Sequence, residues 1–368
     1  MARLRVGVIG CGTIAQVMWL PNLRELDDQF ELKAICDISP GVTESLGEYY
    51  SVSRRFNDYH DLVQDDLDAV IVLTPGSHAA PAIAALEAGK HVIVEKPMCF
   101  TLREADAMIA ASKRASRRLM VAYMKRYDPG YRYGRELVRS MAGLRYVQIN
   151  VLHPSEPQYV SHHRIKRFND VPQATLEALQ HEADQLAAEA IGPVSDRLRF
   201  LYLDVFLGSM IHDVNALRGV LGSPDQSMLT TLWPDNVTYP TITTVLSYRD
   251  GPRAVFTWSY LSELRDYFEE LAFFGEESRV RIQFPSPYLR HFPTPVEVQG
   301  MENGAEWRKR VNVSYAEAFK EELLHFYECV NADREPLTNG SDGKDDIAFL
   351  QKIVAAASPE GLGGEAKR

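Results

Sequence analysis

Two glycines, a small residue and an acid are spaced for binding a dinucleotide. Residues 10–15 read Gly-Cys-Gly-Thr-Ile-Ala, between an apolar run at 5–9 and an expected helix at 16–26. A second apolar run, at 30–36, is followed by Asp37. Strand, glycine turn, helix, strand and acid in this order are typical of a βαβ unit that binds NAD or NADP.

Each residue of this turn has a physical reason. Gly10 permits the tight turn, and Gly12 lets a pyrophosphate approach the backbone N–H groups at the helix N-terminus. Ala15 is small enough for the helix to pack closely on the strand. Thr13 and Ile14 lie between them, so we include both among the cofactor-binding residues.

Asp37 bears on the choice between the two dinucleotides. Its carboxylate would accept hydrogen bonds from the adenosine ribose hydroxyls and would repel the 2′-phosphate of NADP. The next residues, Ile38, Ser39 and Pro40, offer no arginine to hold that phosphate, although the Ser39 hydroxyl can donate one hydrogen bond. We therefore expect NAD or NADP as the cofactor, with NAD favoured.

Alternating strands and helices continue after Asp37. Further strands are expected at 54–56, 68–73, 91–95 and 119–122. Helices are expected at 42–50, 79–88 and 102–115. This alternation predicts an N-terminal doubly wound Rossmann domain of about six parallel strands, which we assign to residues 1–124.

After residue 124 the strands follow one another with few helices between them. They are expected at 147–152, 242–248, 254–260, 269–274, 278–284 and 308–313. Helices are expected at 131–141, 175–191, 197–221, 315–331 and 344–357. This succession favours a large, mostly antiparallel sheet. We predict an α+β domain for substrate binding and oligomerisation over 125–358, then a flexible tail at 359–368, and an α/β fold class for the chain.

Four further motifs occur in the order and spacing of one known family. They are Thr74-Pro75-x-x-His78, Ala88-Gly89-Lys90-His91-Val92, Glu95-Lys96-Pro97 and Arg126-Tyr127-x-Pro129. With the glycine turn, they resemble the Gfo/Idh/MocA family of glucose–fructose oxidoreductases and inositol dehydrogenases. The resemblance implies NAD or NADP and oxidation of a secondary hydroxyl on a sugar, cyclitol or related small molecule. Beyond the glycine turn and Asp37, it implies cofactor binding by Thr74, Pro75, His78, Glu95, Lys96 and Arg126.

Lys96 is the first expected catalytic residue. It follows a buried parallel strand at the carboxyl edge of the sheet, where open α/β sheets bind ligands. Its ammonium can donate to the substrate hydroxyl and stabilise the alkoxide character that develops as hydride leaves. The alternative is that Lys96 only pairs with Glu95 or with a phosphate.

His212 is the second expected catalytic residue. The family carries an Asp, three further residues and then His-Asp, and His212 and Asp213 match the end of that pattern. Gly208 stands where the family has its catalytic Asp, and Asn215 stands where a second Asp is common. This departure puts an inositol-type substrate in doubt. The alternative is a His212 that is merely hydrogen-bonded in the core.

Helical periodicity groups these polar residues. At 100° per residue, one face holds Asp204, Gly208, His212 and Asn215. A polar stripe on an apolar helix is costly unless it lines a wet cavity, so Asp204 and Asn215 are expected to bind substrate. Asp213, a third candidate for substrate binding, lies about 100° away and would rather face a neighbouring strand or Arg126.

The stretch 150–200 is longer than expected before the histidine helix. It contains Arg164, Lys166 and Arg167, the most basic part of the chain. Such a run could bind a carboxylate or phosphate of the substrate. A solvated loop is the more common outcome, and we favour it. The spacing of His153, His162 and His163 matches no metal site, so no metal is expected.

Composition limits the partners and the compartment. The chain has 368 residues, is 45% hydrophobic and carries a formal net charge of −10. Acidic charge argues against nucleic-acid binding. No run is long enough to span a membrane, and no leader precedes the first strand. Scattered cysteines fit a reducing cytoplasm, so the expected partner is a small-molecule substrate, with no nucleic acid and no membrane.

The sequence predicts an NAD(P)-dependent dehydrogenase or reductase acting on CH-OH groups. Two alternatives stay open: an NAD-dependent glycosidase or lyase with transient oxidation, and a non-catalytic cofactor-sensing protein. A homodimer or homotetramer is expected because so large a sheet leaves one face to cover. The apolar strand residues expected at that interface are Phe256, Trp258, Tyr260, Phe273 and Phe284.

Overall fold

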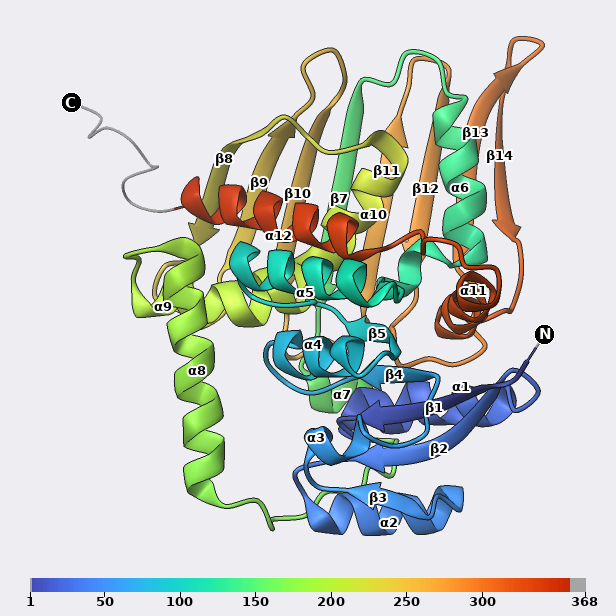
Figure 1. Ribbon diagram of the computed structural model, residues 1–368. Helices are drawn as coiled ribbons and strands as arrows, with labels where there is room; N and C mark the ends of the chain where they lie inside the picture. The colour runs from blue at the N-terminus through green and yellow to red at the C-terminus, as the bar shows by residue number, and fades with distance from the viewer. Residues whose placement is uncertain (1, 358–368) are drawn as a thin grey trace. The chain divides into compact units, whose positions relative to one another are not determined.

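The computed structural model describes residues 2–357, which divide into two units (Figure 1). The first unit comprises residues up to 123 together with 163–192 and 319–347. The second comprises 124–162, 193–318 and 348–357. Two segments of the first unit thus follow residue 124 in the chain. The tail expected at 359–368 lies outside the described residues.

Six parallel strands form the sheet of the first unit, as the alternating pattern predicts. Its order is β3-β2-β1-β4-β5-β6. The strands are β1 (Leu4–Ile9), β2 (Phe30–Cys36), β3 (Arg54–Phe56), β4 (Ala69–Val72), β5 (His91–Glu95) and β6 (Leu119–Ala122). The order reverses between β1 and β4, and open α/β sheets bind ligands at the carboxyl ends of the strands at such a point.

Helices accompany this sheet. They are α1 (Leu20–Glu25), α2 (Pro40–Tyr50), α3 (Tyr59–Leu62), α4 (Ala79–Glu87), α5 (Leu102–Ala115), α8 (Gln173–Ile191), α11 (Ala318–Asn331) and the first half of α12 (Gly340–Ala355). Local signals begin several of them. The Ser39 hydroxyl caps α2 by accepting from the Val42 N–H, and Thr101 and Glu104 form a capping box on α5.

A loop covers the edge of β6. The Val121 N–H donates to the Thr338 carbonyl oxygen at 2.8 Å, and the Thr338 hydroxyl donates back to the Val121 carbonyl oxygen at 2.7 Å. Arg118 holds the same loop by pairing with Asp333 at 2.5 Å and with Glu335. Unpaired strand edges invite pairing with another chain, and this loop protects the edge of β6.

Eight strands form the sheet of the second unit, in the order β14-β13-β12-β11-β7-β10-β9-β8. They are β7 (Tyr146–His153), β8 (Gln226–Trp233), β9 (Thr241–Ser247), β10 (Arg253–Tyr260), β11 (Phe268–Phe274), β12 (Ser278–Phe284), β13 (Pro295–Glu302) and β14 (Ala305–Asn312). All neighbouring pairs are antiparallel except β7 with β10. The predicted mostly antiparallel sheet is confirmed, with β8 and β13 as additional strands.

The second unit contains the helices α6 (Pro129–Arg139), α7 (Glu156–Val160), α9 (Asp196–Leu201), α10 (Ile211–Leu221) and the end of α12. Of these, α6 packs on β12 and β13 of the sheet. The Phe284 ring packs against Tyr131 of α6, and the Trp258 Nε1–H donates to the Ser209 hydroxyl at 3.0 Å. Phe256 and Phe273 are fully buried. The expectation that a dimer interface covers Phe256, Trp258, Phe273 and Phe284 is therefore wrong, because all four are buried within the chain itself.

None of the helices within residues 2–357 is long and apolar enough to cross a membrane.

Candidate functional site

The predicted cofactor residues of the first unit share one edge of its sheet. The glycine turn follows β1, Asp37 follows β2, Thr74 and Pro75 follow β4, and Lys96 follows β5. All of these positions are at carboxyl ends of parallel strands, so they gather at the edge where the strand order reverses.

The glycine turn has the shape that a dinucleotide needs. Gly10 has a φ of +89°, and a Cβ there would lie 2.6 Å from the backbone of Leu73 and Thr74, so only glycine fits. A Cβ on Gly12 would meet no atom within 4 Å. The backbone of Gly12 therefore faces open space, through which a pyrophosphate could reach the N–H groups of the turn. Ala15 is fully buried, as close packing of the following helix requires.

Asp37 is held beside this turn. Its Oδ2 accepts the Cys11 N–H at 2.8 Å, and its Oδ1 accepts the Ser39 N–H at 2.9 Å. These bonds fix the carboxylate and leave each oxygen a second lone pair for a ribose hydroxyl. Turn and acid together fit the adenosine and pyrophosphate of a dinucleotide.

His78 ties the Thr-Pro-x-x-His motif to the Glu-Lys-Pro turn. Its ring is buried, and Nδ1 lies 2.7 Å from the carbonyl oxygen of Pro97, which follows a cis peptide bond. Burial lowers the pKa of His78 to about 4, so the ring is neutral and Nδ1 donates the hydrogen bond. These contacts assign His78 a positioning role at the turn that carries Lys96. Cofactor binding by His78 stays a prediction.

Two buried carboxyl groups, Glu95 and Glu322, interact near the turn that carries the half-buried Lys96. Glu95 accepts the Trp19 Nε1–H at 2.9 Å and the Lys96 N–H at 3.0 Å. Glu322 of α11 is fully buried, and neither of its oxygens has a hydrogen-bond partner among the described residues. Burial, with the charge of Glu95, raises the pKa of Glu322 well above its ordinary range, which favours the neutral form of this carboxyl group. Sequence reasoning missed it, because an acid in an amphipathic helix reads as a solvent-facing residue.

In the second unit, His212 lies half-buried at the start of α10. The preceding segment, Tyr202–Met210, is a π-helix. A π-helix takes more residues per turn than an α-helix, so the 100° spacing that aligned Asp204 and Gly208 with His212 does not hold across it. The alignment of these residues therefore does not follow from α-helical spacing, and the single polar stripe stays a prediction. A Cβ on Gly208 would meet only the Leu203 carbonyl oxygen, at 3.5 Å, so a side chain fits there.

Asp213 and Asn215 are buried among partners of the second unit. Arg126 Nη1 donates to Asn215 Oδ1 at 3.3 Å. Lys125 Nζ lies 3.7 Å from Asp213 Oδ1 and also contacts the Glu269 carboxylate on β11. Burial raises the pKa of Asp213 to about 6, against the opposing effect of Lys125. The cation beside Asp213 is thus Lys125 rather than Arg126.

Asp213, Asn215 and Arg126, which were predicted to bind substrate or cofactor, thus contact other residues of the protein. The roles of Asp213 and Asn215 in substrate binding, and of Arg126 in cofactor binding, stay predictions. Asp204 is exposed and bonds to the Tyr239 hydroxyl, whose pKa burial raises to about 12 with a contribution from Asp204. Asp204 thus remains open to a polar ligand.

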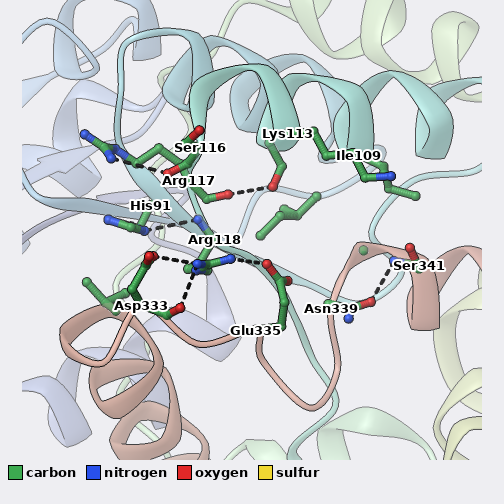
Figure 2. A pocket seen from close by; sticks show the side chains of 14 residues that line it. His91, Ile109, Lys113, Ser116, Arg117, Arg118, Asp333, Glu335, Asn339 and Ser341 are labelled. Atoms are coloured by element: carbon green, nitrogen blue, oxygen red, sulfur yellow. Dashed lines mark hydrogen bonds and ion pairs between the residues drawn. The ribbon is translucent and has the colours of Figure 1, made fainter.

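A separate hollow of about 960 Å³ lies at the amino ends of β5 and β6 (Figure 2). Its two arginines are engaged within the protein: Arg117 Nε donates to the Gly89 carbonyl oxygen at 2.6 Å, and Arg118 holds Asp333 and Glu335. The hollow is at the edge opposite the glycine turn, so it is not part of the candidate site.

Comparisons with known proteins show which proteins this chain is similar to. A model of the oxidoreductase family with an NAD-binding Rossmann fold, GFO_IDH_MocA, matches residues 4–123. Inositol 2-dehydrogenase from Salmonella typhimurium is 30% identical over 191 residues, 49% of this chain and 53% of that protein. The match thus spans about half the length of that relative.

Two further similarities extend over nearly the whole chain. Myo-inositol 2-dehydrogenase from Thermotoga maritima is 25% identical over 366 residues, 97% of this chain and 96% of that protein. The structure of aldose-aldose oxidoreductase from Caulobacter crescentus matches 98% of both chains with a TM-score of 0.74 and 24% identity, which shows a shared fold.

Proposed function

We propose that the chain is a member of the Gfo/Idh/MocA family of oxidoreductases and acts as an NAD(P)-dependent dehydrogenase or reductase, because the family model matches residues 4–123 and a relative that is 25% identical matches 97% of the chain. It transfers a hydride between nicotinamide and a secondary hydroxyl, or the matching ketone, of a sugar, cyclitol or related small molecule. One observation carries this proposal: the space above Gly12 is open while the Asp37 carboxylate is fixed beside it. The inositol 2-dehydrogenases among its relatives support the substrate class.

The side chains divide the proposed chemistry between them. A bound nicotinamide would supply the hydride chemistry. Lys96 donates to the substrate oxygen and stabilises its alkoxide character, and its ammonium is positioned by the turn that His78 holds. His212 takes or gives the hydroxyl proton. Asp204 binds a distal hydroxyl of the substrate.

A binding titration followed by a substrate screen tests this function. The purified protein should bind NAD⁺ or NADP⁺ and change absorbance at the nicotinamide band with at least one cyclitol or aldose. Lys96→Ala should lose turnover while it keeps its affinity for the cofactor. Absence of dinucleotide binding would refute the proposal. Cleavage of nitrophenyl glycosides without net absorbance change at that band would point instead to a glycosidase that oxidises its substrate transiently.

We also propose that the chain forms a homodimer or homotetramer through the outer face of the eight-stranded sheet. Side chains on this face alternate with the buried ones, and on β8 they include Leu229, 48% exposed, and Trp233, 75% exposed. Light scattering at micromolar protein should give a multiple of 41.5 kDa. A mass equal to one chain would refute this assembly.

A cytoplasmic location is proposed on the state of the cysteines. Cys11, Cys36, Cys99 and Cys329 are all free and buried. Unpaired cysteines are typical of a reducing compartment. Cell fractionation with an antibody against the chain would test the location, and recovery outside the cytoplasmic fraction would contradict it.

A further inference from the structure

Residues 163–170, here called the strap, lie against the glycine turn of the first unit, to which both belong. Gln16 Nε2 donates to the Lys166 carbonyl oxygen at 3.0 Å, and the Lys166 N–H donates to Gln16 Oε1 at 2.7 Å. Arg167 Nη2 donates to the Thr13 hydroxyl at 3.2 Å. The basic run is exposed, as a solvated loop is, yet it is fixed beside the cofactor residues rather than free in solvent.

Asp170 at the end of the strap takes two donors next to Asp37. The Ser39 hydroxyl donates to Asp170 Oδ1 at 2.6 Å, and the Gly41 N–H donates to Asp170 Oδ2 at 2.7 Å. These hydrogen bonds lower the pKa of Asp170, so it is charged at neutral pH. The Phe168 ring packs over Gly41, where a Cβ would lie 2.5 Å from it. The strap therefore places a second carboxylate close to the acid that would bind the adenosine ribose.

The two occupied donors are those that a 2′-phosphate would need. In a Rossmann unit the acid after the second strand contacts the ribose 2′-hydroxyl, and NADP requires donors near that position. Here the Ser39 hydroxyl and the Gly41 N–H at the N-terminus of α2 are two such donors, and both are bound to Asp170. The 2′-phosphate of NADP would have to displace the Asp170 carboxylate or lie beside it. Two like charges about 4 Å apart repel by about 1 kcal/mol even in water.

We propose that Asp170 is a specificity-determining residue that makes the protein select NAD over NADP by occupying the Ser39 hydroxyl and the Gly41 N–H. This inference rests on the proposed function, because it assumes that the glycine turn binds a dinucleotide. Asp37 disfavours the 2′-phosphate from the sheet edge, and Asp170 does so from the strap. The selection thus depends on a residue 131 positions away from its partner Ser39 in the chain.

The test is a comparison of dissociation constants for NAD⁺ and NADP⁺, measured by calorimetry on the wild-type protein, Asp170→Asn and Asp170→Ala. The wild type should prefer NAD⁺. Each variant should bind NADP⁺ about tenfold more tightly, and NAD⁺ nearly as before. Asp184→Asn, an exposed acid on α8, is the matched control and should change neither constant.

A second substitution separates a local effect from a general one. Ser39→Ala combined with Asp170→Asn should reverse the gain in NADP⁺ affinity, because the freed hydroxyl is the donor that the phosphate gains. An unchanged ratio of the two dissociation constants in both single variants would overturn the inference, as would an equal gain for both cofactors. If the wild type binds neither dinucleotide, the proposed function itself fails, and the inference with it.

Discussion

The buried lysine of the second unit allows a test with a calculable magnitude. Lys125 is 5% exposed, and its Nζ lies 3.7 Å from Asp213, contacts Glu269 and sits 5.0 Å from the centroid of the Phe284 ring. Lys125→Met keeps much of the length of the side chain but removes its charge. Two fully buried carboxyl groups then lose the cation between them.

The expected cost follows from the burial of all three groups. Removing one partner of a buried ion pair destabilises a protein by about 3–5 kcal/mol, because the remaining charge is uncompensated. At about 2–4 °C per kcal/mol for a unit of this size, the Tm should fall by about 6–20 °C. This loss is a large part of the typical total stability of about 5–15 kcal/mol.

The pH dependence has a definite sign. Burial already raises the pKa of Asp213 to about 6, and loss of Lys125 raises it further. A carboxyl whose pKa is raised by folding stabilises the fold fully below its unfolded pKa of about 4 and loses that stabilisation as pH rises through the folded value. Lys125→Met should therefore be more destabilising at about pH 8 than at about pH 5.

Thermal unfolding followed by circular dichroism and calorimetry at both pH values checks this. Lys113→Met, the same change at an exposed lysine of α5, is the control and should alter stability by no more than about 0.5 kcal/mol. Adding Glu269→Gln to Lys125→Met should recover part of the loss. A Tm equal to that of the wild type at both pH values, or a penalty that grows as pH falls, would refute the reasoning.

Three further predictions concern the candidate site. Glu322→Gln should raise the Tm, and the gain in Tm should grow as pH rises above about 4. A carboxyl group whose pKa is raised by folding loses stabilisation as pH rises, whereas an amide does not. A gain in Tm that becomes smaller at higher pH would contradict this. His212→Ala should lower kcat by about 10²–10⁴-fold in the nicotinamide absorbance assay with unchanged cofactor affinity, and retained turnover would place proton transfer elsewhere. The free energy of unfolding of Gly208→Asp should lie within about 1 kcal/mol of the wild-type value, because a Cβ at this position has room. The same variant should turn over simple cyclitols faster than the wild type. Unchanged turnover would show that something other than the missing carboxylate limits the reaction with cyclitols.

The parallel sheet and the glycine turn could be predicted because their signals are local. Strands such as β4 are buried on both faces, so they appear as continuous apolar runs. β8 is an edge strand with a mostly exposed, Ser- and Thr-rich sequence, and β13 contains Pro, Glu and Gly, so neither has an apolar run to reveal it.

The parts of the site that escaped prediction depend on tertiary structure. The π-helix at 202–210 has no sequence period that distinguishes it from an α-helix, so the face on which Asp204 lies could not be derived. Glu322 looks like an ordinary helical acid in the sequence, although the fold buries it fully. The contact of Asp170 with Ser39 joins distant parts of the chain, and no local pattern encodes it.

The covered edge of β6 has a consequence for how the chain folds as it is synthesised. The first unit contains residues 319–347, which supply Thr338 to that edge and Tyr327 to the ring of Phe30. At about 5–20 residues per second, a ribosome needs roughly 10–40 s to proceed from β6 to Thr338. Throughout that interval the nascent sheet has an open edge, and the unit that would bind the cofactor is incomplete. Its folding on the ribosome is therefore completed late, although all six of its strands are synthesised early.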